Sequence, residues 1–279
     1  MRSSGACSKK GPPEARRAER AAERVTGVEE PHLIRQLFEA ESVPRRSLGE
    51  RRGFGDVPWG ALDLIVVSVV GLFAQAVLMP MGYVGTAHLA SPTADAEALS
   101  FFVGAVASYT VLLGAVWLFA IRRHHASAAS LGFRPVDVRG LVGLLGVFAL
   151  TVAGANLIVG SITALPTTQE FFRFAHRPTD IALLAVLIVV AAPVVEETFF
   201  RGFLLQGLAR RFTFWPAAVV TSAVFALAHV WWQLYVPIFV LGLAFAWLFW
   251  RTGSLWASIA AHATINATSL FVALALGRW

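Results

Sequence analysis

Seven long runs of apolar residues account for most of the chain, and each is close to the roughly 20 residues that a helix needs to cross a bilayer. The runs are residues 59–79, 99–121, 140–165, 181–203, 215–232, 235–250 and 254–276. Tryptophans stand at several of their ends, as they do at membrane–water interfaces. This pattern predicts an all-α polytopic membrane protein with about seven transmembrane helices.

The first 57 residues have a different character. They hold 12 Lys or Arg and nine Asp or Glu, interspersed with Ala, Pro and Gly. Such a segment has too little apolar surface to fold on its own. We expect residues 1–57 to be a basic, largely disordered cytoplasmic tail, and residues 58–279 to form the transmembrane domain. Contact between the arginine pairs of the tail and lipid headgroups is the alternative.

The amino-acid composition narrows the possible classes of protein further. Of the 279 residues, 57% are hydrophobic and 14% are charged, against roughly 25% charged in soluble domains. We attribute the net charge of +6 to contact with anionic lipid or to control of membrane topology, and not to nucleic-acid binding. Cys7 is the only cysteine, which excludes an intramolecular disulfide and a cysteine-based metal site. Nothing in the sequence indicates an oligomeric state.

Basic residues also predict the orientation in the membrane. With the N-terminus inside, 20 of the 23 Lys and Arg residues fall in inner segments, and only Arg173, Arg177 and Arg278 fall outside. The positive-inside rule therefore predicts a cytoplasmic N-terminus and an extracytoplasmic C-terminus. Residues 201–212 could continue the fourth span or lie along the inner interface as an amphipathic helix.

Two adjacent carboxylates, Glu196 and Glu197, end the apolar part of the fourth run. Carboxylates at membrane depth are costly and therefore mark functional sites. At about 100° per residue, Glu197 and Arg201 share a helical face and can pair, while Glu196 points elsewhere. We therefore expect a structural role for Glu197 and Arg201. Glu196 has no such partner on its own helix and is available for chemistry.

Two further polar positions lie within apolar runs. His229 follows Phe225 by four residues, and His262 precedes Asn266 by four, so that each pair projects from one helical face. Of seven histidines, only these two lie in the middle of apolar segments. A buried polar network that holds helices together is the alternative to a functional site here.

Together, these positions resemble a known family. E-E-x-x-x-R at 196–201, F-x-x-x-H at 225–229 and H-x-x-x-N at 262–266, in this order, resemble the motifs of the CAAX prenyl endopeptidases and bacteriocin-processing enzymes. These are intramembrane metalloproteases of the CPBP family. The stretches L-G-F-R-P at 131–135 and R-T-G-S-L-W at 251–256 strengthen the likeness, which covers roughly residues 132–266.

The resemblance implies an intramembrane endopeptidase that cleaves a peptide or protein substrate near the membrane, by CAAX-type processing or a related reaction. It implies Glu196 as the general base for a water molecule and His229 as a residue that holds this water. It also implies His262 and Asn266 as donors to the oxyanion. A zinc ion held by Glu196, His229 and His262 is compatible with these residue types, although the compact H-E-x-x-H arrangement is missing. Activation by glutamate without a metal is the other possibility.

Two other classes compete with an enzyme. The chain could be a non-catalytic membrane scaffold or a bacteriocin self-immunity protein with the same fold. A small transporter with Glu196 as its proton site is the third possibility, and the lack of internal repeats counts against it. Serine nucleophiles are disfavoured because Ser222, Ser254 and Ser258 show no triad arrangement in the sequence.

Overall fold

The computed structural model describes residues 54–87, 94–136, 177–229 and 232–275, with three short pieces at 141–142, 145–146 and 148–149. All of them belong to one compact unit, Pro44–Trp279. Within these residues every regular element is helical, which confirms the all-α class. The predicted tail lies outside the described residues except for 54–57.

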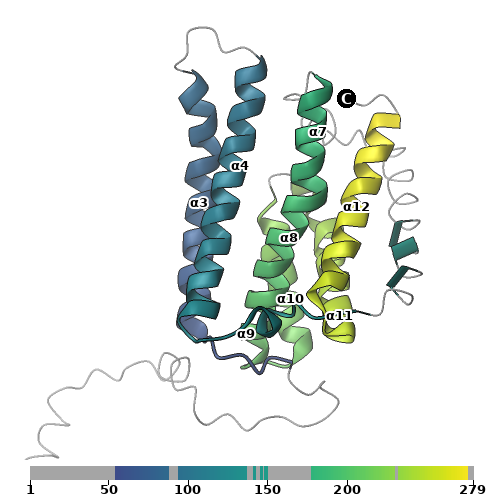
Figure 1. Ribbon diagram of the computed structural model, residues 1–279. Helices are drawn as coiled ribbons and strands as arrows, with labels where there is room; N and C mark the ends of the chain where they lie inside the picture. The colour runs from purple at the N-terminus through teal and green to yellow at the C-terminus, as the bar shows by residue number, and fades with distance from the viewer. Residues whose placement is uncertain are drawn as a thin grey trace, which may run out of the picture. The chain divides into compact units, whose positions relative to one another are not determined.

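The first two helices of the described residues form an antiparallel pair. α3 (Ala61–Ala87) and α4 (Ala94–Val116) run side by side (Figure 1). α4 continues into a π-helical segment, η1 (Trp117–Arg122), which is followed by a short 3₁₀ turn, η2 (Ala128–Leu131). At the start of α3, the buried Asp63 accepts a hydrogen bond from Gly60 N at 2.9 Å and lies 3.0 Å from Nε2 of His124. The buried carboxylate is therefore compensated at the end of the helix pair.

The next described rod carries both glutamates and changes its hydrogen-bond pattern several times. Its segments are α7 (Pro178–Val186), η3 (Leu187–Ala191), α8 (Ala192–Glu197), η4 (Thr198–Leu205) and α9 (Gln206–Ala209). η3 and η4 are π-helical, a form that often occurs at functional sites. Every residue from 197 to 207 is buried. Residues 201–209 therefore continue the rod, and most of them are packed inside the protein.

A helical hairpin and a last helix complete the described fold. α10 (Phe214–Leu227) is followed by the 3₁₀ turn η5 (Trp232–Leu234), α11 (Tyr235–Thr252) and α12 (Leu255–Ala275). α11 packs against α10 on one side and α12 on the other. A Cβ atom on Gly242 would lie 2.9 Å from Cβ of Ser222, so glycine permits the close approach of α10 and α11.

Five described helical stretches are long and apolar enough to cross a membrane: Ala61–Leu78, Leu99–Arg122, Pro178–Ala209, Trp232–Thr252 and Leu255–Ala275. They correspond to the first, second, fourth, sixth and seventh predicted spans, and they confirm a polytopic membrane protein. The third predicted span, 140–165, lies mostly outside the described residues. The prediction of a full fifth span at 215–232 is not met. α10 has 14 residues, a rise of about 21 Å, and it ends before His229.

The segment around Gly132 ties three elements together at one end of the helices. Gly132 O accepts a hydrogen bond from Leu255 N at 2.7 Å, and Ser130 O accepts one from Nε2 of Gln206 at 2.9 Å. Gly132 adopts a positive φ of 102°, and a Cβ atom there would lie 2.4 Å from the ring of Phe249. Glycine is required at this position for both backbone conformation and space.

We therefore expect Gly132→Ala to destabilise the protein by about 2–4 kcal/mol, from the left-handed backbone and from overpacking. Gly114→Ala is the matched control, because a Cβ atom at Gly114 meets nothing within 4 Å. Thermal unfolding in detergent measures both variants. Equal melting temperatures for the two would contradict the close packing of residues 130–134 against α11 and α12.

Candidate functional site

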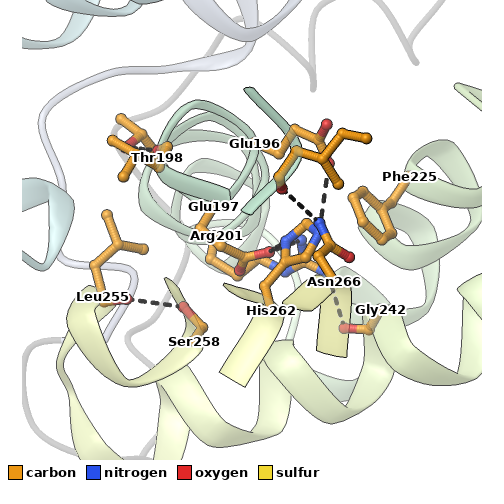
Figure 2. Close-up of polar contacts among 12 residues, drawn as sticks. Glu196, Glu197, Thr198, Arg201, Phe225, Gly242, Leu255, Ser258, His262 and Asn266 are labelled. Atoms are coloured by element: carbon orange, nitrogen blue, oxygen red, sulfur yellow. Dashed lines mark hydrogen bonds and ion pairs between the residues drawn. The ribbon is translucent and has the colours of Figure 1, made fainter. Parts of the chain in front are cut away.

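Glu197 lies at the centre of a buried polar cluster, shown in Figure 2, and its side chain is 0% exposed. Its Oε1 atom accepts a hydrogen bond from Nη1 of Arg201 at 2.8 Å. The same oxygen lies 3.0 Å from Nδ1 of His262. The predicted Glu197–Arg201 contact is thus present, and α12 joins it through His262.

Arg201 is enclosed by groups that compensate its charge. Its Nη2 donates to the backbone oxygen of Gly242 on α11 at 3.1 Å. The guanidinium carbon also lies 4.5 Å from the ring centre of Phe225 and 5.3 Å from that of Phe245. A desolvated guanidinium gains from such aromatic faces. Arg201 therefore links the rod to both helices of the α10–α11 hairpin.

Glu196 is in a different environment from its neighbour, because its side chain is 20% exposed. Oε1 accepts a hydrogen bond from the hydroxyl of Tyr109 on α4 at 3.4 Å. Oε2 lies 3.9 Å from Nε2 of His262, too far for a direct hydrogen bond. Glu196 is thus the accessible carboxylate of the pair, and it faces α4 and α12.

His262 is held in a defined orientation. Its ring stacks on Phe245, with 5.0 Å between ring centres and an interplanar angle of 18°. Because a carboxylate only accepts, the contact with Glu197 requires that Nδ1 of His262 carry the proton. In the neutral ring Nε2 is then the unprotonated nitrogen, and this is the nitrogen nearest to Glu196.

Asn266 lies one turn beyond His262 on α12 and contacts the rod. Its Nδ2 donates to the backbone oxygen of Ile188 at 2.9 Å. Ile188 belongs to the π-helical segment η3, where the change in hydrogen-bond register opens carbonyl groups to outside donors. The amide nitrogen keeps a second hydrogen for another acceptor. His262 and Asn266 therefore both face the rod, as their spacing predicts.

His229 is the predicted site residue with the least direct connection. It follows the end of α10, and its Nδ1 contacts the backbone oxygen of Phe225 at 2.8 Å. The Phe225 ring lies 5.0 Å from the ring of His229 and 5.9 Å from that of His262. In the described part of the chain His229 thus reaches the cluster through Phe225, and not through a hydrogen bond to either glutamate.

The three candidate metal ligands, Glu196, His229 and His262, do not come together as one group in this structure. Among the described residues, no three or more His, Cys, Asp or Glu side chains gather closely enough to hold a metal ion. Glu196 and His262 approach each other, but His229 does not complete the set with them. The arrangement of the candidate ligands in this structure does not fit a zinc centre.

Tyr109 is a site residue that the motifs did not indicate. It lies within the second predicted span, far in sequence from the three motifs. The sequence feature that could have indicated Tyr109 is its hydroxyl in the middle of an apolar run, where a polar group needs a partner. The contact of His262 with Glu197 was also unforeseen, because helical periodicity relates residues within one helix and not between helices.

Comparison with known proteins identifies a related family. The family model for type II CAAX prenyl endopeptidases of the Rce1-like kind matches residues 178–268. This range contains the rod, the hairpin and most of α12. It includes all of the predicted site residues and excludes α3 and α4.

Two curated proteins are also similar. An "Uncharacterized 24.3 kDa protein" of Escherichia coli is 32% identical over 170 residues, which are 58% of this chain and 76% of that protein. "Putative membrane peptidase YdiL" of Bacillus subtilis (strain 168) is 27% identical over 86 residues, which are 31% of this chain and 35% of that protein. No solved structure gives a significant match.

These findings define a class of multi-pass membrane peptidases. The chain belongs to the Rce1-like type II CAAX prenyl endopeptidase family, the CPBP family.

The buried ion pair between Glu197 and Arg201 should contribute to stability. Glu197→Gln leaves Arg201 without a counter-charge, and loss of one member of a buried pair costs about 3–5 kcal/mol. We expect the single variant to accumulate poorly and to melt earlier. The double variant Glu197→Gln with Arg201→Gln should recover part of the loss, because no orphan charge remains. Detergent-solubilised yield and thermal unfolding test this, and a double variant worse than Glu197→Gln would contradict it.

Proposed function

We propose that the protein is an intramembrane endopeptidase in which Glu196 activates a water molecule to hydrolyse a peptide bond. The observation that carries this proposal is the contrast between the two glutamates. Glu197 is fully buried and bound to Arg201 and His262, whereas Glu196 is partly exposed. A general base must reach its water and keep an oxygen free to take the proton.

The space between Glu196 and His262 suits such a water. Oε2 and Nε2 are 3.9 Å apart, and polar groups at such separations are often bridged by a water molecule. In the proposed step Oε2 takes a proton from the water, whose oxygen bonds to the substrate carbonyl carbon. The carbonyl π electrons move to the oxygen. The C–N bond of this intermediate then breaks, and Glu196 returns the proton to the leaving amine.

Glu197 and Arg201 serve this step through His262. The Glu197 carboxylate fixes the Nδ1 proton of His262 and the plane of its ring, much as a buried acid orients the histidine of a hydrolase. The oxyanion needs donors. The second amide hydrogen of Asn266 and, when His262 is protonated, its Nε2–H are the proposed ones. We assign His229 a role in holding water or substrate at the end of α10.

The substrate proposed here is a peptide or protein segment at the membrane, cleaved by CAAX-type processing or a related reaction. Family membership supports this class, and so does a site built among membrane-spanning helices. Residues 58–279 would form the peptidase domain, and residues 1–57 a cytoplasmic tail. A non-catalytic scaffold or self-immunity protein would carry the same fold without turnover.

Glu196→Gln should therefore abolish cleavage while leaving yield and melting temperature nearly normal, because the amide keeps the shape but cannot take the proton. The assay uses purified protein in liposomes, a farnesylated CAAX peptide and a library of unprenylated peptides, with products identified by mass spectrometry. Ser258→Ala is the control, since its hydroxyl donates to the backbone of its own helix, at Leu255 O. Full activity of Glu196→Gln, or no cleavage by the wild type, would overturn the enzyme proposal.

The orientation of the chain in the membrane can be tested with reporter fusions. Arg210 and Arg211 precede α10, and Arg251 lies in the last turn of α11. The hairpin thus starts and ends on the same side whether or not its tip crosses the membrane. A short α10 leaves the predicted orientation unchanged. Alkaline phosphatase fused after Trp279 should be active outside the cytoplasm, and the same reporter fused after Arg123 should be inactive. The reverse pattern would contradict a cytoplasmic N-terminus.

A further inference from the structure

Tyr109 brings a helix from outside the family-matched region into the site. It lies on α4, whereas the family model begins at residue 178. Its hydroxyl donates to Oε1 of Glu196 at 3.4 Å, across 87 positions of sequence. α4 packs directly against α8, which carries Glu196. The proposed base thus has a partner on a helix that none of the three motifs includes.

The neighbours of Tyr109 show why its hydroxyl is different. Ser108 donates to Ala105 O at 2.9 Å, and Thr110 donates to Val106 O at 2.7 Å. Both hydroxyls are therefore satisfied by their own helix. A tyrosine hydroxyl stands at the far end of a rigid ring and cannot turn back to its own backbone in this way, so it needs a partner elsewhere when removed from water. Glu196 supplies that acceptor.

The two oxygens of Glu196 are consequently not equivalent. Oε1 is engaged by Tyr109 from α4, and Oε2 faces Nε2 of His262 on α12. A carboxylate held at one oxygen cannot rotate freely about its last torsion. The hydrogen bond from Tyr109 also compensates for part of the solvation that the charged carboxylate loses in apolar surroundings. The free oxygen is then the one that points toward the proposed water.

We propose that Tyr109 is a positioning residue for Glu196, which holds Oε1 so that Oε2 acts as the base. This inference rests on the proposed function, and it extends the site from the matched region to α4. Tyr109 does not touch the reacting atoms. It acts through the orientation of the Glu196 carboxylate, and its loss should slow turnover without weakening substrate binding.

The experiment compares Tyr109→Phe with wild type, using the peptide that the wild type cleaves best in the liposome assay. A hydrogen bond to a charged group contributes about 1.5–3 kcal/mol, and at 3.4 Å the lower end applies, which is about a tenfold change in rate. We expect kcat to fall about tenfold, with KM within about twofold of wild type by the same argument. Thr110→Val is the control: it removes the adjacent hydroxyl, which donates to the backbone of its own helix, and should leave kcat unchanged.

A second measurement does not depend on activity. Melting temperatures of the wild type, Tyr109→Phe, Glu196→Ala and their double variant form a cycle, in which alanine removes the acceptor, and contact between the two side chains predicts non-additive changes. An unchanged kcat in Tyr109→Phe, while Glu196→Gln is inactive, would overturn the role of Tyr109 alone. Additive melting temperatures would overturn the contact. Activity in Glu196→Gln would instead overturn the proposed function.

Discussion

The rest of the structure depends on one constraint: the charges of Glu197 and Arg201 are fully removed from water inside an apolar bundle. An uncompensated charge there would be too costly, and three neighbouring helices supply partners. α12 gives His262, α11 gives the backbone oxygen of Gly242, and α10 gives the ring of Phe225. The pair therefore sets which helices must meet. The close approach of α10 and α11 at Gly242 is part of the same arrangement.

The π-helical segments of the rod add a second set of links. A changed hydrogen-bond register leaves backbone oxygens open, and buried carbonyl groups need donors. Asn266 donates to Ile188 O in η3 at 2.9 Å, and Nε1 of Trp59 donates to Phe203 O in η4 at 3.0 Å. Each donor comes from another element of the fold. The helix that carries both glutamates is thus fixed on either side of them, so that side-chain positions at the site are set by long-range contacts.

Much of this was predictable from sequence, within limits that have physical causes. Apolar length located five of the spans, and the i, i+4 rule anticipated the Glu197–Arg201 contact. The fifth predicted run, 215–232, is longer than the helix it forms, because hydropathy does not register where a helix ends and α10 stops before His229. π-Helical segments leave no pattern in side-chain hydrophobicity. The approach of Tyr109 to Glu196 depends on the packing of α4 on α8, which periodicity within one helix cannot reveal.

The two adjacent glutamates lie in different environments on one helix. Adjacent residues point about 100° apart, so one carboxylate can face the interior of the bundle while the next faces a less buried side. Glu197 has two charged or polar partners on one oxygen and no exposure. Glu196 has one long hydrogen bond and retains access. If the roles were exchanged, the base would be neutralised by Arg201 and closed to water. Family membership establishes the peptidase class, whereas the inequality of these two side chains supports the assignment of the base.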